Sequence, residues 1–491
     1  MLQRLHKAFL ENKSNNAFCI EDIYYTYSEV YSLTVKIAQL LKDNPSGSDV
    51  IGIIVSNNVE TYAAILACWF SGKAYVPINP QLPEGRNKLV LESANVHLLL
   101  NCAEDDVNYD DLRVFDVLHI EMGDVTGVLT CTDREDDSLM YVLFTSGSTG
   151  LPKGVPINYK NLHAFLASYE ALGFAISASD RFLQMFEFTF DVSVASFLVP
   201  LMYGACVYTV PAAGVKYVNV IKTLRDKQIT VACLVPSIIT YMKPYFDRLS
   251  LPAVKYCILT AEASNIYDII KWKACIPNSE VYNLYGPTEA TIWCTAYRLD
   301  TSTPKSYNDM MAIGKPLQQV KAVIIDEAGN LASNNIKGQL CIAGKQITSG
   351  YINNQQKNTE SFIALYDEQY YKTGDLCYVD EEGDIYYCGR MDYQVKVNGH
   401  RIELGEIEAM VRRLFAVNNI AILYRDKDGI DKIFLMLEDF DEIDDVKAAL
   451  KKELPYYMLP HVISSMKTFP INNSNKIDRI ALKTYIEQYN G

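Results

Sequence analysis

One segment of the chain combines an apolar strand with a loop of glycines and hydroxyls and then a lysine. It reads YVLFTSGSTGLPKGV, from Tyr141 to Val155. Backbone amides beside glycines, hydroxyl donors and one ammonium group together suit a polyphosphate. The segment differs from a Walker A loop, in which GK precedes Ser or Thr, because Lys153 lies between Pro152 and Gly154. A flexible polar turn is the simpler alternative, but six Thr, Ser or Gly residues in succession disfavour it. The candidate phosphate-binding residues are Thr145, Ser146, Gly147, Ser148, Thr149, Gly150 and Lys153.

A second segment, NLYGPTEATI from Asn283 to Ile292, offers an aromatic ring, a hydroxyl and a carboxylate. The ring of Tyr285 provides a flat face on which adenine can stack. Thr288 offers a hydroxyl to the α-phosphate, and Glu289 offers a hard oxygen ligand for magnesium held by ATP. A Gly-Pro turn with a helix-capping Thr and Glu is the structural alternative. The other candidates for this nucleotide site are Asn283 and Gly286, with Thr145 as a second magnesium ligand.

A third segment, FEFTFDVSVAS, places Asp191 among apolar neighbours. A carboxylate in such a strand or helix needs a cation or a hydrogen-bond partner. A structural salt bridge would satisfy it, and so would a cationic group on a substrate.

These residues require elements that hold them together, and the pattern between residues 49 and 285 predicts such elements. DVIGIIV and AYVPI read as buried strands on either side of a helix, VETYAAILACWFSG, that ends at Gly72. The same alternation recurs at ACVYTV, VNVIKTLRDKQ and ITVACLV, and again at VKYCILT, NIYDIIKWKACI and VYNLY. Strands alternating with helices of this length indicate an α/β architecture with parallel sheets.

After about residue 314 the pattern changes to short strands separated by Gly and Asp-Glu turns, typical of a small antiparallel, barrel-like subdomain. From Tyr393 a smaller α+β unit of about 100 residues follows. We therefore expect two domains. Residues 1–391 form a large N-terminal α/β domain that binds nucleotide and substrate, and residues 392–491 form a mobile C-terminal lid.

Composition and charge exclude several classes. The chain has 491 residues, of which 49% are hydrophobic and 21% charged, as in a globular protein. Its net charge of −14 argues against nucleic acid or anionic lipid as a partner. The cysteines are scattered without a CxxC pair, as expected for buried thiols in a reducing compartment. No secretory signal or apolar run of about 18 residues is present, so we expect a cytoplasmic protein without a membrane segment.

Five segments together resemble, in the correct order, the motifs of the adenylate-forming superfamily. This superfamily contains acyl-CoA synthetases, luciferases and the adenylation domains of nonribosomal peptide synthetases. The phosphate loop and NLYGPTEATI are followed by YKTGDL, GRMDYQVKVNGHRIELGEIE and NSNKIDR. The resemblance covers nearly the whole chain. It implies a ligase that uses ATP and Mg²⁺ to convert a carboxylate into an acyl-AMP with release of pyrophosphate.

The resemblance also assigns roles to residues that would otherwise be ordinary surface charges. Asp375 would bind the ribose diol, and Arg390 would meet the ribose or phosphate side of ATP. Lys476 would bridge the substrate carboxylate and the ester oxygen of the adenylate, where a cation stabilises developing charge. Asp392 would be the hinge of the lid, and Lys396 would lie on the lid face that serves the second half-reaction.

Asp191 favours an amino acid as the substrate. In the adenylation domains that the chain resembles, this aspartate pairs with the α-ammonium of the substrate, which fatty and aryl acids lack. The corresponding side-chain pocket has no charged member, so we expect a small uncharged amino acid. Trp293 would fill the pocket floor, whereas Ala195 and Ala261 would open volume. The remaining pocket residues are Val192, Cys233, Leu259, Leu284 and Ile292.

The thiol acceptor is expected to be separate. No carrier domain follows the final lysine motif and no condensation motif precedes the chain, so it resembles stand-alone ligases such as those for D-alanyl carrier protein. We therefore predict a monomeric amino acid–carrier protein ligase that uses the phosphopantetheine arm of a separate carrier protein. An acyl-CoA synthetase of the same superfamily is the main alternative. A non-catalytic nucleotide-binding protein and a phosphotransferase that releases ADP are weaker ones.

Overall fold

The computed structural model describes residues 1–104, 109, 112–123, 129, 134–147, 151–471 and 477–490. The chain forms two compact units. The larger unit contains Met1–Pro80, Val90–Phe144 and Gly154–Gly389. The smaller unit contains Gln81–Leu89, Thr145–Lys153 and Arg390–Gly491. The functional division at residue 391 stays a prediction.

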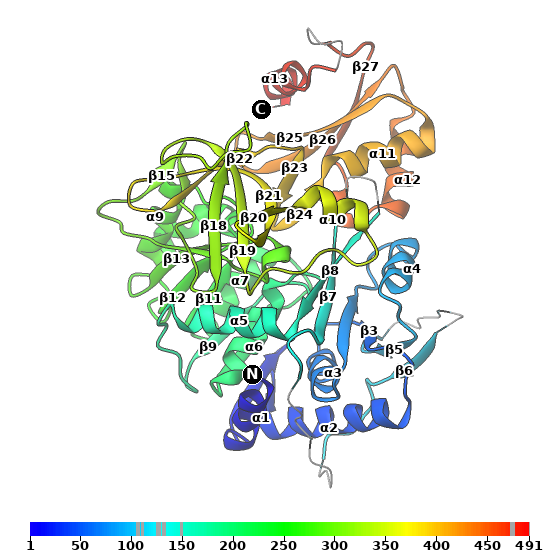
Figure 1. The fold of residues 1–491 in the computed structure, drawn as a ribbon, viewed down its shortest axis with the longest axis vertical. Helices are drawn as coiled ribbons and strands as arrows, with labels where there is room; N and C mark the ends of the chain where they lie inside the picture. The colour runs from blue at the N-terminus through cyan, green and yellow to red at the C-terminus, as the bar shows by residue number, and fades with distance from the viewer. Residues whose placement is uncertain are drawn as a thin grey trace. The chain divides into compact units, whose positions relative to one another are not determined.

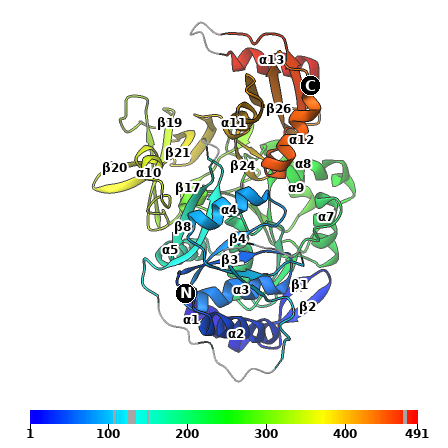
Figure 2. The ribbon, with the colours of Figure 1, turned by 90° about the vertical axis from the view of Figure 1, so that its right-hand side faces the viewer.

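A six-stranded sheet in the larger unit begins with the predicted strand–helix–strand pattern. Its strand order is β6-β5-β3-β4-β7-β8, and the pairs β3/β4, β3/β5, β5/β6 and β4/β7 are parallel. Between β3 and β4 runs α3, whose N-terminus is capped by the Asn58 side chain. All residues of α3 except Glu60 are buried, as its mostly apolar sequence requires. Figure 2 shows α3 along one face of β3 and β4. The elements are β3 (Val50–Ile54), α3 (Val59–Phe70), β4 (Ala74–Ile78), α4 (Glu84–Ser93), β5 (Leu98–Asn101), β6 (Arg113–Asp116), β7 (Leu139–Thr145) and β8 (Lys153–Asn158).

A nine-stranded sheet contains the other two predicted repeats. Its order is β17-β14-β13-β12-β11-β9-β10-β1-β2, and its central strands from β13 to β1 are parallel. Its strands are β1 (Asn16–Ile20), β2 (Ile23–Thr26), β9 (Arg181–Gln184), β10 (Cys206–Thr209), β11 (Val231–Leu234), β12 (Tyr256–Leu259), β13 (Glu280–Tyr285), β14 (Thr295–Arg298) and β17 (Lys315–Pro316). The helices of this part are α1 (Leu2–Glu11), α2 (Tyr27–Asp43), α5 (Tyr159–Glu170), α6 (Val192–Met202), α7 (Lys216–Asp226), α8 (Pro236–Met242) and α9 (Ile266–Cys275). The predicted α/β class is confirmed.

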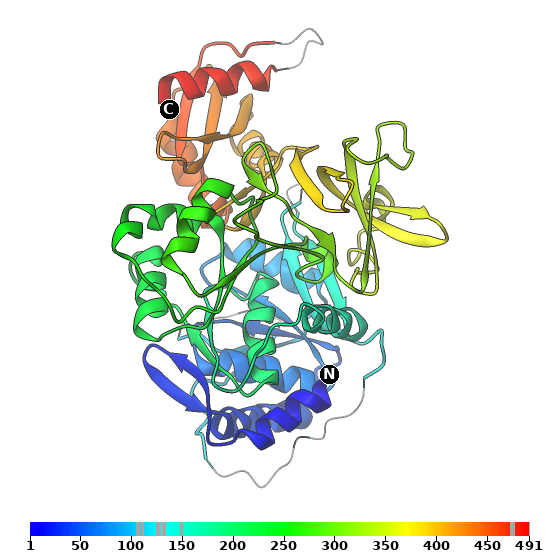
Figure 3. The ribbon, with the colours of Figure 1, turned by 90° about the vertical axis from the view of Figure 1, so that its left-hand side faces the viewer.

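The predicted change to antiparallel strands is also present. A five-stranded sheet has the order β18-β19-β21-β20, with β22 paired to β21. In Figure 3 its yellow-green and yellow strands lie to one side of the green helices of the same unit. Its elements are β18 (Val320–Ile325), β19 (Gly338–Gly344), α10 (Gln355–Ser361), β20 (Phe362–Leu365), β21 (Glu368–Val379) and β22 (Ile385–Arg390), and a separate ribbon joins β15 (Ser306–Tyr307) to β16 (Met310–Met311).

The C-terminal part of the smaller unit is an α+β fold. The strands β25, β26 and β27 form one sheet, and β23 pairs with β24. The helices α11 and α13 contact β25, and Figure 1 shows α13 beside this sheet. The elements are β23 (Gln394–Val397), β24 (His400–Glu403), α11 (Leu404–Phe415), β25 (Asn419–Arg425), β26 (Asp431–Glu438), α12 (Ile443–Glu453), β27 (Val462–Met466) and α13 (Arg479–Asn490).

Two hydrophobic clusters cover opposite faces of the nine-stranded sheet. In β11, Val231 and Cys233 enter the first cluster, whereas Ala232 and Leu234 enter the second. This alternation follows from the two-residue period of a strand. Among the described residues, no helix is long and apolar enough to cross a membrane, and no described cysteine forms a disulfide.

Candidate active site

Asp191 lies at the N-terminus of α6 as a buried carboxylate. Its Oδ2 atom has no hydrogen-bond partner among the described residues. Burial raises the pKa of Asp191 to about 7. Hydrogen bonds from the backbones of Val192 and Ile292 and from the Thr288 hydroxyl act against this rise, and the negative charge of Glu289 adds to it. One oxygen of the carboxylate therefore has no donor from the part of the chain that the structure describes.

The nucleotide candidates Tyr285 and Asp375 lie next to each other in the larger unit. Tyr285 ends β13, and its hydroxyl donates a hydrogen bond to Oδ2 of Asp375 in β21. Burial and the charge of Asp375 raise the pKa of Tyr285 well above its usual value, so the phenol stays a donor. Asn283, in the same strand, donates to the carbonyl of Ala312 at 2.9 Å. The structure thus brings together residues that the sequence separates by 90 positions.

The loop after β13 makes a close approach at Gly286. A Cβ atom at this position would lie 2.3 Å from the carbonyl oxygen of Ile292 and 2.8 Å from Cα of Trp293. Any larger residue would therefore push the chain segment at 292–293 away. Gly286 serves packing here, in addition to its predicted place beside the nucleotide.

Glu289 lies in a short 3-10 helix, Thr288–Ala290, and is fully buried. The Tyr351 hydroxyl donates a hydrogen bond to its Oε1 at 2.7 Å. The hydroxyl of Tyr371 lies 3.3 Å from that of Tyr351. Neither tyrosine was in the predicted site. The only sequence signal for Tyr351 is its position directly after Gly350.

The donor chemistry fits a magnesium ion. Glu289 offers a hard carboxylate that is buried in the larger unit. The other predicted ligand, Thr145, belongs to the smaller unit, where its Oγ1 is buried with no hydrogen-bond partner among the described residues. Magnesium typically takes one or two protein oxygens and completes its shell with phosphates and waters. No cluster of three or more His, Cys, Asp or Glu side chains suited to a metal occurs among the described residues. A magnesium ion at Glu289 would therefore take its other ligands from the phosphates of ATP and from water.

In the smaller unit, the phosphate-loop residues contact the segment 401–406. Ser146 Oγ donates to the carbonyl of Arg401 at 3.0 Å, and the Gly147 N–H donates to Glu406 Oε2 at 3.3 Å. Lys153 Nζ lies 3.6 Å from Oε1 of Glu403. The Gly147 amide and the Lys153 ammonium group thus contact carboxylate oxygens. The same groups are suited to bind the anionic oxygens of a phosphate. The predicted loop residues Ser148, Thr149 and Gly150 lie outside the described residues.

The predicted hinge residue Asp392 is paired with Arg390. The arginine Nε and one terminal nitrogen donate to the two carboxylate oxygens at 2.8 and 2.6 Å. Burial opposes ionisation, but these hydrogen bonds and the charge of Arg390 hold the pKa of Asp392 below its usual value. Lys396 lies on β23 and pairs in register with Arg401 of β24. The predicted catalytic Lys476 lies outside the described residues.

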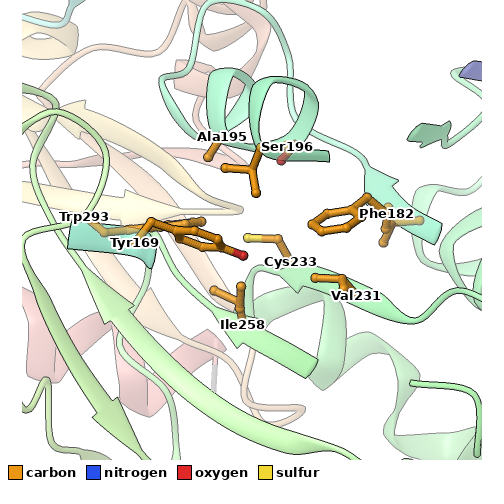
Figure 4. Close-up of a pocket in the computed structure, with 10 residues that line it drawn as sticks. Tyr169, Phe182, Ala195, Ser196, Val231, Cys233, Ile258 and Trp293 are labelled. Carbon is orange, nitrogen blue, oxygen red and sulfur yellow. The ribbon is translucent and has the colours of Figure 1, made fainter. Parts of the chain in front are cut away.

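Three predicted pocket residues line a common cavity in the larger unit. They are Ala195 on α6, Cys233 on β11 and Trp293, shown in Figure 4. The cavity has a volume of about 10 Å³, which is the space of about one water molecule. Its lining is almost entirely apolar, and burial raises the pKa of the Cys233 thiol well above its usual value. The lining residues that sequence reasoning missed are Tyr169, Phe182, Leu183, Ser196, Val199, Val231 and Ile258.

The other predicted pocket residues lie elsewhere in the core. Val192, Leu284 and Ile292 are buried in the first hydrophobic cluster, which also contains Cys233 and Trp293. Leu259 lies in the second cluster, and Ala261 packs against that cluster with a positive φ of 69°. Strand alternation explains the position of Leu259, because its neighbour Ile258 lines the cavity from the opposite face of β12.

The fold and this site define a class of protein. The larger unit holds the buried Glu289 and the Tyr285–Asp375 pair, which joins β13 of the nine-stranded sheet to β21 of the antiparallel sheet. The chain belongs to the AMP-binding enzyme family, whose model matches residues 6–352.

Curated relatives narrow this class. The chain is 32% identical over 473 residues to zwittermicin A synthase ZmaJ of Bacillus cereus, covering 93% of this chain and 89% of that protein. It is 31% identical over 497 residues to tyrocidine synthase 3 of Brevibacillus parabrevis, covering 97% of this chain but only 8% of that protein. The chain therefore spans nearly all of the first relative and a small part of the second.

Solved structures show the same fold. The Vibrio cholerae adenylation domain AlmE, in complex with glycyl-adenosine-5'-phosphate, has a TM-score of 0.87 at 24% identity and covers 99% of this chain and 97% of its own. PA1221, a nonribosomal peptide synthetase protein containing adenylation and PCP domains, has a TM-score of 0.85 at 22% identity, covering 98% and 83%. Within its family, the chain is an adenylate-forming enzyme of the nonribosomal peptide synthetase adenylation type.

Proposed function

We propose that this enzyme activates a small uncharged amino acid as aminoacyl-AMP and then transfers it to the phosphopantetheine thiol of a separate carrier protein. The observation that carries the proposal is the buried Asp191 carboxylate, whose Oδ2 lacks a hydrogen-bond partner in the described structure. Its other hydrogen bonds do not supply a positive charge, and a buried charge that lacks an ionic partner costs several kcal/mol. The α-ammonium group of an amino acid would supply the missing partner.

In the first half-reaction, the substrate carboxylate attacks the α-phosphorus of ATP and pyrophosphate leaves. Tyr285 and Asp375 hold adenine and ribose, and Thr145–Lys153 hold the phosphates. Thr288 already donates to Asp191 and could also turn towards the α-phosphate, which would link recognition of the ammonium to the reacting centre. A bound Mg²⁺ would neutralise phosphate charge. Lys476 would stabilise the developing charge on the adenylate, so the protein acts by positioning and electrostatics.

In the second half-reaction, the carrier thiol attacks the carbonyl carbon of the mixed anhydride and AMP leaves. We assign the lid rotation between the steps to Asp392, and Lys396 to the lid face used in transfer. The bidentate pairing of Arg390 with Asp392 supports a linked role for these two residues. Nonribosomal peptide synthetase relatives that contain PCP domains support a carrier as the acceptor.

The side-chain pocket favours a substrate the size of glycine or alanine. The cavity beside Trp293 holds about one water molecule, and no charged residue lines it. A four-domain nonribosomal peptide synthetase that is 25% identical to this chain is described as bound to AMP and glycine, which is compatible with such a substrate. A cytoplasmic location, a monomeric state and the absence of a nucleic acid partner stay predictions.

A pyrophosphate-exchange panel tests the proposal. Wild type and Asp191→Ala are compared with glycine, D- and L-alanine and propionate, the des-amino analogue of alanine. The ammonium–carboxylate pair predicts that propionate is a poor substrate and that the mutation impairs alanine far more than propionate. The KM for ATP should stay nearly unchanged. If wild type uses propionate as well as any amino acid, Asp191 is structural. The acyl-CoA synthetase alternative, which transfers to free coenzyme A, would then take precedence.

A further inference from the structure

Trp293 is held in one orientation by residues outside the predicted pocket. Its indole Nε1 donates a hydrogen bond to Oγ1 of Thr260 at 2.8 Å. Its ring also stacks on Tyr169, with centroids 6.1 Å apart and planes at 28°. Figure 4 shows these two rings side by side at the cavity. Trp293 therefore forms part of the cavity wall, and the backbone of the adjacent Ile292 donates a hydrogen bond to Asp191.

The backbone that leads into Trp293 is strained. Thr291 and Ile292 have positive φ values of 56° and 74°. Both residues are β-branched, and positive φ is a true outlier for such side chains. Such a strained residue persists only where its surroundings hold it. Some contact must therefore keep this turn in place.

Gln346 supplies that contact. Its Nε2 donates to the carbonyl of Trp293 at 2.7 Å and to that of Ala290 at 3.3 Å, one on each side of the strained turn. Its backbone carbonyl accepts a hydrogen bond from the Thr291 hydroxyl. The Gln346 side chain is fully buried, so loss of its amide donors would leave the two carbonyls without these hydrogen bonds, which is unfavourable for buried groups. Asn161 in turn holds this segment by donating to the carbonyls of Lys345 and Ile347.

We propose that Gln346 is a positioning residue that sets the upper size limit of the substrate side chain, acting through Trp293. This inference rests on the proposed function. Without the two amide donations, the strained turn relaxes and the indole leaves its place against Thr260. The space of the indole then joins the cavity lined by Tyr169, Val231 and Ile258. Longer apolar side chains would gain a site.

The test is the substrate-size preference of variants. Gln346→Met keeps the side-chain length but cannot donate, and Thr260→Val cannot accept the indole N–H. Thr260→Ser keeps the acceptor, and Thr34→Val removes a buried hydroxyl bond to Val30 in α2 as a control for general destabilisation. Pyrophosphate exchange is measured with alanine and leucine, and with their des-amino analogues propionate and 4-methylpentanoate. The measured quantity is the ratio of kcat/KM for the large over the small member of each pair.

We expect this ratio to rise about tenfold in Gln346→Met, the low end of the effect that one methylene group in a pocket produces. The rise should be smaller in Thr260→Val, which removes only the acceptor of the indole N–H. Thr260→Ser and Thr34→Val should keep the wild-type ratio. Loss of stability alone lowers kcat/KM by the same factor for the large and the small substrate. An unchanged ratio in Gln346→Met overturns the inference, as does a wild type that uses leucine as well as alanine. If Gln346→Met does not fold, Gln346→Ala gives the same comparison, because it also removes the amide that bridges the carbonyls of Ala290 and Trp293. Failure of the proposed function looks different: propionate would match alanine, while the size ratio of the two acids would still report on Gln346.

Discussion

The hydroxyl of Tyr351 donates a hydrogen bond to Oε1 of Glu289 at 2.7 Å, although 62 residues separate them in the chain. Glu289 also has its carbonyl bonded to the N–H of Thr348 at 2.9 Å. Both contacts come from the segment that follows β19. The carboxylate that we propose as the magnesium ligand is thus oriented from outside its own loop.

Loss of the Tyr351 hydroxyl should weaken magnesium binding. Groups that orient a metal ligand typically change affinity or activity about 10–100-fold when removed. We therefore expect Tyr351→Phe to raise the Mg²⁺ concentration needed for half-maximal pyrophosphate exchange by about tenfold. Tyr371→Phe is the matched control, because it leaves the Tyr351 hydroxyl beside Glu289. If both variants need the same Mg²⁺ concentration, Tyr351 does not orient the magnesium ligand.

Amino-acid activation should depend on the ionisation of Asp191. The carboxyl has a pKa of about 7 in the substrate-free protein, and only its charged form pairs with an ammonium group. kcat/KM for alanine, which reports the free enzyme, should therefore fall about tenfold per pH unit below about pH 7. The titratable groups near Asp191 are Glu289, whose negative charge disfavours ionisation of Asp191, and Tyr141, whose own pKa is raised by burial and by Asp191 so that it stays a neutral phenol. Asp191→Asn should have much lower activity and no such acidic limb. A wild-type profile that is flat from pH 5 to pH 7 would contradict the assignment.

The same carboxylate should destabilise the substrate-free protein at neutral pH. Its pKa is raised from 3.8 to about 7 by burial, so the folded state binds the proton more tightly than the unfolded state. The cost is absent near pH 4, grows as the pH rises through this window and is complete above about pH 7. Asp191→Asn should raise the free energy of unfolding at pH 8 by at most about 4 kcal/mol and have little effect at pH 4. Denaturant titrations at pH 4 and pH 8 measure the free energy of unfolding. If Asp191→Asn is stabilised equally at both pH values, packing and not the charge of Asp191 explains the gain.

Lys476→Ala should lower amino-acid-dependent pyrophosphate exchange by several decades. By analogy with a removed oxyanion-hole donor, this corresponds to about 3–5 kcal/mol of transition-state stabilisation. Thioester formation from pre-made aminoacyl-AMP should persist, because the lysine serves adenylation in our proposal. Lys467→Ala is a control for the loss of one positive charge in the same C-terminal region. Near-normal exchange in Lys476→Ala would exclude the role.

Asp392→Pro should separate the two half-reactions. Proline fixes φ at the proposed hinge and hinders the lid rotation. Adenylation should persist, whereas transfer to a carrier thiol should fall. Asp392→Ala is the control, since it also loses the pairing with Arg390 but leaves the backbone free to rotate. If the alanine variant loses transfer as fully as the proline variant, the salt bridge and not the backbone governs the step.

The sequence by itself determined the elements and most of the chemistry-bearing residues. Continuous apolar runs such as those of β3 and β4 predict buried parallel strands, because a strand covered on both faces needs no polar side chain. The helix between them ends within two residues of its predicted end. Glu289, Asp191 and the phosphate loop stood out because their polar side chains interrupt apolar or glycine-rich segments.

The tertiary structure alone decided which distant residues meet these groups. Tyr351, Gln346 and Tyr169 have ordinary local contexts, and their roles arise only where β19, α5 and the loop after β13 approach one another. The positive φ values of Thr291 and Ile292 could not be predicted, because local sequence disfavours them and long-range hydrogen bonds hold them. Likewise, the apolar run of β12 does not say which of Ile258 and Leu259 lines the cavity; the packing of each face of the sheet settles that. Local propensity selects the elements, but the contacts that tune a site depend on side chains far apart in the chain.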